Sequence, residues 1–155
     1  MTAELNRLAR GATIHCLTGC GIGEVLGMVI GTALHWSNTR TMVVAIVLAF
    51  LFGYSMTVGP LLRAGFPPGR AASLALAADT ASIVLMELID NGIMLVIPGA
   101  MDAHIDSGLF WSSLAGSLAI AGLAAYPLNR WLISRGRGHA LVHESAGHDP
   151  HGHTH

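Results

Sequence analysis

Long apolar stretches set the hydrophobic pattern of this chain. Four of them reach the length of about 20 predominantly apolar residues that a helix needs to cross a bilayer. Turn-forming residues separate these stretches, so neighbouring spans are joined by short connections and run antiparallel. The pattern therefore predicts an all-α membrane protein, a four-transmembrane-helix bundle. The predicted spans cover about residues 11–36, 41–62, 71–97 and 109–131.

Composition agrees with this membrane prediction. Of the 155 residues, 52% are hydrophobic and only 11% are charged, and the mean hydropathy is +0.57. These values lie outside the range of ordinary soluble domains and argue against a water-soluble enzyme. The net charge is -1 and every basic residue is an arginine, so we expect the lipid bilayer and no nucleic acid as partner.

The arginines predict how the bundle is oriented. Seven of the eight fall before the first span, between the second and third, or after the fourth, and only Arg40 falls on the other side. The positive-inside rule then places both termini in the cytoplasm. Trp111 and Trp131 bracket the fourth span, as aromatic residues at the two membrane interfaces do.

A row of glycines runs along the first span at intervals of four residues. Such small-xxx-small rows let another backbone approach closely, so we expect this row to serve helix packing. A homo-oligomer or another membrane protein could supply the facing helix. The row comprises Gly19, Gly23, Gly27 and Gly31.

Beside the glycines runs a second row with the same spacing: Cys16, Cys20, Glu24 and Met28, with His15 one step away. Two thiols one helical turn apart are poorly placed for a disulfide but can contribute thiolates to Cu(I) or Zn(II). The alternative is that both cysteines are ordinary small buried residues.

The third span carries a polar face, while Ile83, Val84 and Leu88 project elsewhere. Spans one and three run in the same direction, and counting from the cytoplasmic end puts Asp79 level with both cysteines, Glu87 with Glu24, and Asp90 with Met28. No lysine or arginine lies in the interior of any span, so these carboxyl groups must be protonated, share protons or bind a cation. The alternative is a set of neutral acids hydrogen-bonded across the bundle. The polar face comprises Asp79, Ser82, Met86, Glu87, Asp90 and Met94, with Asn91 at its edge.

Two further segments carry candidate ligands. The external loop at residues 101–106 contains Asp102, His104 and Asp106, which either collect a metal at the outer mouth or simply face water. We expect residues 1–137 to form the membrane domain and residues 138–155 a disordered cytoplasmic tail. The tail is rich in histidine, which fits a metal buffer and a plain polar tail equally well. Its histidines are His139, His143, His148, His151, His153 and His155.

Three strings, HCLTGCGIGEVLGMVIGTAL, DTASIVLMELIDNGIMLVIPGAMDA and YPLNRWLISRGRGHA, carry a resemblance to a known family. Over nearly the whole chain from Gly11 to about His139 it resembles small bacterial membrane proteins grouped as a domain of unknown function, DUF4396. The resemblance implies a four-helix protein of the bacterial inner membrane. It also implies a link to copper handling, without residue roles.

Three functions fit these observations. The first is a metal-cation transporter or channel, with copper or zinc as the ion and the facing rows of spans one and three as its route. The second is a static membrane metal or redox protein, with His15, His35 and the cysteines as ligands. The third is a non-catalytic accessory or assembly subunit. Proton-coupled carriage of a small molecule is a variant of the first.

Overall fold

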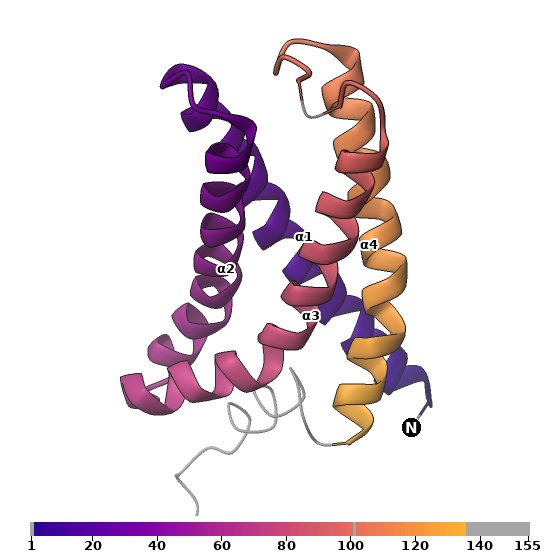
Figure 1. Cartoon of the computed structure of the whole chain (residues 1–155). Coiled ribbons are helices and arrows are strands. Elements are labelled where there is room, and N and C mark those ends of the chain that lie inside the picture. The colour runs from indigo at the N-terminus through magenta and orange to yellow at the C-terminus, as the bar shows by residue number, and fades with distance from the viewer. Residues whose placement is uncertain (1, 101, 136–155) are drawn as a thin grey trace, which may run out of the picture.

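The computed structural model describes residues 2–100 and 102–135. These residues form four helices joined by short connections (Figure 1). Each helix is long and apolar enough to cross a membrane, so the predicted all-α architecture with four helices of membrane-spanning length is confirmed. The tail with its six histidines lies outside the described residues. The helices are α1 (Thr2–Ala33), α2 (Asn38–Arg63), α3 (Pro68–Val96) and α4 (Gly108–Ser134).

Helix ends follow the local sequence. α3 begins with Pro68 at its first turn, where the missing amide hydrogen costs nothing. α4 begins after Ser107, whose hydroxyl accepts a hydrogen bond from the Phe110 amide. The largest difference from prediction is in α1, which begins at Thr2 instead of near residue 11 and ends at Ala33, before a turn in which His35 has a φ of 51°. The polar first turns therefore continue the helix beyond the apolar span.

The four helices form two hairpins, α1–α2 and α3–α4, that pack side by side (Figure 1). α1 also packs on α4 and α2 on α3, and α1 meets α3 more sparsely across the middle of the bundle. The start of α1 and the end of α4 lie at the same end, where Arg130 donates to the Asn6 side chain at 2.9 Å. We call this the arginine-rich end. At the other end lie the tips of the two hairpins, residues 34–37 in the first and residues 97–100 and 102–107 in the second.

The glycine row of α1 packs against α2. A Cβ added to Gly19 would lie 2.8 Å from the Gly53 Cα, and one added to Gly27 would lie 2.5 Å from the Ala45 Cα. Gly23 meets Ala49 in the same way, and Gly31 meets Thr41. On α2, small buried residues recur at every fourth position and pack against this glycine row. The row is therefore used within the chain, and in this structure it is not free to receive a second copy.

The other faces of the bundle are apolar and exposed, as contact with lipid requires. α2 is the least buried helix. On α3, Val84 and Leu88 are exposed, whereas Ile83 is fully buried against Gly53 of α2. α3 therefore buries two faces, one toward α2 and one toward the bundle interior.

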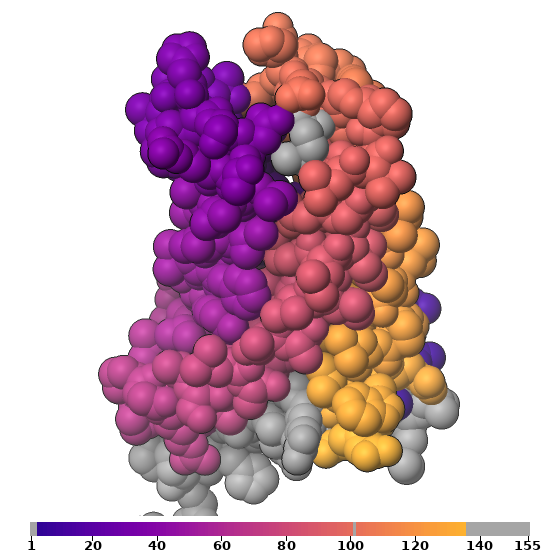
Figure 2. Space-filling view, in the orientation of Figure 1, coloured from indigo at the N-terminus to yellow at the C-terminus, as the bar shows by residue number. Residues whose placement is uncertain are grey.

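The arginine-rich end is closed by packing. Ala9, Ala12 and Ile133 form an apolar cluster between α1 and α4, and Leu61 with Ala71 forms another between α2 and α3. Beside the first cluster, buried Asn129 donates a hydrogen bond to the Thr13 hydroxyl at 3.0 Å. At the tips, by contrast, the space-filling view shows the molecule hollowed between the two hairpins (Figure 2).

Candidate functional site

Polar side chains of α1 and α3 meet in the interior of the bundle. Cys16 of α1 interacts with Asp79 and Ser82 of α3, and one turn further along Cys20 interacts with Glu87. Both thiols are free, fully buried, and packed in one core cluster with Met86. This arrangement places thiols of one helix beside carboxyl groups of the other along the membrane normal.

Glu24 sits at the next level of this row. Its carboxyl group interacts with those of Asp90 and Glu87, and the Glu24 side chain is only 6% exposed. Three carboxyl groups from two helices are thus neighbours at one level of the membrane interior. The chain has no lysine, and its arginines lie near the helix ends. Carboxylates so placed need a proton or a cation, since charges repel strongly where water is excluded.

The three carboxyl groups differ in their hydrogen-bond partners. The Ser117 hydroxyl of α4 donates to the Asp90 Oδ1. The Asn91 side-chain amide donates to the Glu87 Oε2 at 3.2 Å. Neither oxygen of Glu24 has a hydrogen-bond partner within 3.5 Å among the described residues. Both oxygens of Glu24 and the Oε1 of Glu87 are therefore buried with no hydrogen-bond partner within 3.5 Å among the described residues, and such atoms are costly unless something else binds them.

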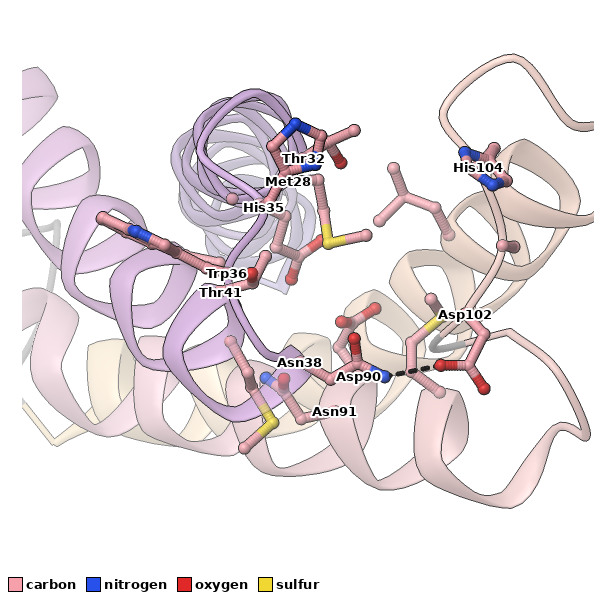
Figure 3. Close-up of a pocket in the computed structure, with 17 residues that line it drawn as sticks. Met28, Thr32, His35, Trp36, Asn38, Thr41, Asp90, Asn91, Asp102 and His104 are labelled. Carbon is pink, nitrogen blue, oxygen red and sulfur yellow. Dashed lines mark hydrogen bonds between the residues drawn. The ribbon is translucent and has the colours of Figure 1, made fainter.

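A pocket of about 270 Å³ leads from the tips of the hairpins down to this level. Glu24 and Asp90 line its inner part, and Met28 and Met94 lie along it. Figure 3 shows Met28 and Asp90 among the lining residues, with Asp102 and His104 of the α3–α4 tip to their right. The pocket therefore joins the buried carboxyl groups to the surface at one end of the molecule.

The mouth of the pocket is crossed by a hydrogen bond between the two hairpins. The Asn38 side-chain amide, at the start of α2, donates to the Asp102 Oδ1 at 2.7 Å (Figure 3). His35 and Trp36 line the pocket from the α1–α2 tip. Residues of the external loop thus do more than face water, since Asp102 and His104 border the entrance.

Other site residues predicted from the sequence have different places. His15 turns toward α2, where its Nε2 lies 2.9 Å from the Thr57 hydroxyl. In the described residues no three or more histidine, cysteine, aspartate or glutamate side chains are grouped so that they could hold a metal ion. The cysteines instead interact with Asp79 and Glu87, and Glu24 interacts with Glu87 and Asp90. The histidines of the tail lie outside the described residues.

Sequence reasoning missed the contributions of the other two helices. Ser117 of α4 and Asn38 of α2 hold two of the carboxyl groups through hydrogen bonds. Ser113 and Ser117, four residues apart and both buried, form a short polar row in α4 that could have signalled this. No pattern within α2 points to Asn38, because its partner is 64 residues away.

Comparison with known proteins adds one finding. The model of the family described as a domain of unknown function (DUF4396) matches residues 6–138, which span all four helices. No curated protein and no solved structure matches the chain. The chemistry of the site therefore has to be argued from its own residues.

Proposed function

The chain belongs to the DUF4396 family, whose description names no activity, and we propose from the site itself that it is a cation-translocating membrane protein. The cation is a metal ion of the copper or zinc type. It enters the pocket between the hairpin tips and passes along the row of carboxyl and sulfur groups between α1 and α3.

The observation that carries this proposal is the environment of Glu24. Its two oxygens are buried without a hydrogen-bond partner within 3.5 Å among the described residues, beside the carboxyl groups of Glu87 and Asp90, at the inner part of a pocket open to one end. A cation satisfies such oxygens and offsets the repulsion between the carboxylates. Ionisable groups inside a membrane protein commonly mark the route of an ion.

The type of cation follows from the neighbouring sulfur atoms. Met28 and Met94 line the pocket, and Cys20 and Cys16 continue the row inward. Thioether and thiolate ligands favour Cu(I) and Zn(II), whereas calcium and magnesium prefer oxygen alone. Ligands spread over several levels permit handover from one to the next, which a pathway requires.

Orientation is part of the proposal. The positive-inside rule assigns the arginine-rich end, and with it both chain termini, to the cytoplasm. The pocket then opens away from the cytoplasm, on the outer face of a bacterial inner membrane. The apolar clusters around Ala12 and Leu61 form the cytoplasmic closure.

Metal flux into proteoliposomes tests the function. With zinc or copper supplied on one side, we expect Glu24→Gln and Asp90→Asn each to lower the flux by roughly tenfold or more, since losing a charged ligand costs over about 1.4 kcal/mol. Asp106→Asn is the matched control, because it makes the same change at an exposed residue that does not line the pocket. Flux that is unchanged in both buried variants, with fold and reconstitution equal, would overturn the proposal.

A further inference from the structure

Arg40 is the arginine that the orientation of the bundle does not explain. It lies in the first turn of α2, at the tips, whereas the other described arginines lie at the arginine-rich end. Its side chain is exposed. Among residues 2–100 and 102–135, no carboxylate lies within 4.0 Å of the Arg40 guanidinium, and no hydrogen bond holds it. Its positive charge therefore has no protein partner in the described structure.

A cavity of about 360 Å³ lies beside Arg40. Trp36 and Thr39 line it from the tip and the start of α2, and Val43 and Val44 line it from the next turn of the helix. The cavity therefore combines one unpaired cation, on the side of the tip, with apolar side chains on the side of the membrane span.

The cavity lies at the level expected for a membrane interface. Trp36 belongs to the tip of one hairpin, and Trp111 lies at the start of α4 in the other, so both tryptophans mark this end of the molecule. Beyond the cavity the surface of α2 continues apolar, with Val47 and Leu51 exposed at intervals of four residues. Arg40 thus lies at the level of lipid head groups, and the valines lie at the level of acyl chains.

We propose that this cavity binds an anionic phospholipid, with the phosphate at Arg40 and one acyl chain against Val43 and Val44. Charge complementarity selects the head group, because a guanidinium forms strong charge-assisted hydrogen bonds with a phosphate. The apolar wall selects the chain, since a free phosphate ion would leave the valines uncovered. No carboxyl group of the described chain lines this cavity, so the inference is independent of the proposed cation route.

Trp36 separates the lipid cavity from the pocket between the hairpins. Its side chain is half-buried and lines both spaces. Figure 3 shows Trp36 at the left of the view and Asp102 and His104, which border the mouth of the pocket, at the right. A lipid bound at Arg40 therefore contacts the α1–α2 tip from outside the pocket and leaves the mouth open.

Quenching of Trp36 fluorescence by brominated lipids tests this site. Trp111→Phe and Trp131→Phe leave Trp36 as the sole tryptophan of the full-length chain. The protein is reconstituted into vesicles of equal parts phosphatidylglycerol and phosphatidylcholine, with bromine on the acyl chains of one lipid or of the other. The two lipids carry the same phosphate and chains, but choline neutralises the second. The difference in quenching therefore measures the preference for an anionic lipid.

We expect phosphatidylglycerol to contact Trp36 about fivefold more often than phosphatidylcholine, the factor that corresponds to about 1 kcal/mol for one arginine near anionic lipid. Arg40→Gln should abolish this preference, and Arg40→Lys, which keeps the charge, should retain most of it. Arg63→Gln is the matched control, because it removes an exposed arginine at the other end of the same helix. It should leave the preference unchanged.

Equal quenching by the two lipids in the parent would overturn the lipid site, as would a preference that survives Arg40→Gln. A third arm adds inorganic phosphate at constant ionic strength. The preference should persist, because the free ion has no chain to cover the valines. Loss of the preference in this arm would show that an anion alone fills the site, and would overturn the assignment to a lipid.

Discussion

Gly23 of α1 lies against the backbone of Ala49 of α2, closer than any side chain would permit. The nearest atoms to a Cβ built on Gly23 are the Ala49 amide nitrogen and Cα, which belong to the middle of a helix and have no freedom to move aside. The α1–α2 hairpin is therefore held by backbone contact, a form of packing that membrane helices use where the hydrophobic effect gives no preference.

Gly23→Ala should destabilise the protein by about 2 kcal/mol, because overpacking a tight contact costs on the order of 1–3 kcal/mol. Thermal unfolding in detergent measures the effect. Gly116→Ala is the matched control, since a Cβ at this exposed helical glycine of α4 meets nothing within 4 Å. Equal stability of Gly23→Ala and the parent would contradict the backbone contact.

The hydrogen bond between Asn38 and Asp102 should limit access to the pocket. It is the side-chain hydrogen bond that joins the two tips in the described structure, and a bond of this kind contributes about 1 kcal/mol. In a background with Cys16→Ser and Cys20→Ser, a Met28→Cys thiol reports on access from the mouth. Adding Asn38→Ala should raise its labelling rate about fivefold, the factor that corresponds to about 1 kcal/mol.

Ser55→Ala is the control for this experiment. The Ser55 hydroxyl donates within its own helix, to the Leu51 carbonyl at 2.6 Å, and is exposed. Its loss should leave the labelling rate unchanged. If Asn38→Ala labels no faster than Ser55→Ala, the bond between the tips does not restrict entry.

Cysteine labelling in intact cells tests the proposed orientation of the bundle in the membrane. In the same cysteine-free background, Asp106→Cys lies at the tips and Ser134→Cys at the arginine-rich end, and both positions are exposed. A maleimide that cannot cross membranes should label Asp106→Cys in intact cells and Ser134→Cys only after permeabilisation. The reverse pattern would invert the bundle and place the pocket on the cytoplasmic side.

Much of the fold is readable from local sequence. The four apolar stretches, Pro68 and Ser107 at helix starts and the short connections are each local signals, and the helices follow them within a few residues except at the start of α1. That helix begins early because the polar residues before Gly11 are helix-compatible but not apolar. Hydropathy identifies the apolar part of a helix. It does not detect the polar turns that extend the same helix beyond the apolar part.

The candidate site, like the fold, could be predicted from the sequence only in part. Depth counting along α1 and α3 puts Asp79 level with both cysteines, Glu87 with Glu24 and Asp90 with Met28, because both helices rise by a fixed distance per residue. In the structure Cys16 does interact with Asp79, and Glu24 with Glu87, but Cys20 interacts with Glu87 and Glu24 also with Asp90. Periodicity could not say that His15 meets Thr57 of α2, or that Ile83 is buried, since both depend on which helix fills the neighbouring space. The contribution of Ser117 depends on α4 in the same manner.

By itself, the sequence determined that this is a membrane protein with four spans that carry acids and thiols at membrane depth. Length and hydropathy are properties of each helix taken alone, so the sequence of one span is enough to predict them. Only the tertiary structure decided that the glycine row packs against α2 within the chain, that Glu24 meets Asp90, and that a pocket from the tips ends at this pair. These features depend on how helices are placed around one another. Packing between residues distant in sequence sets that placement, and no local pattern encodes it.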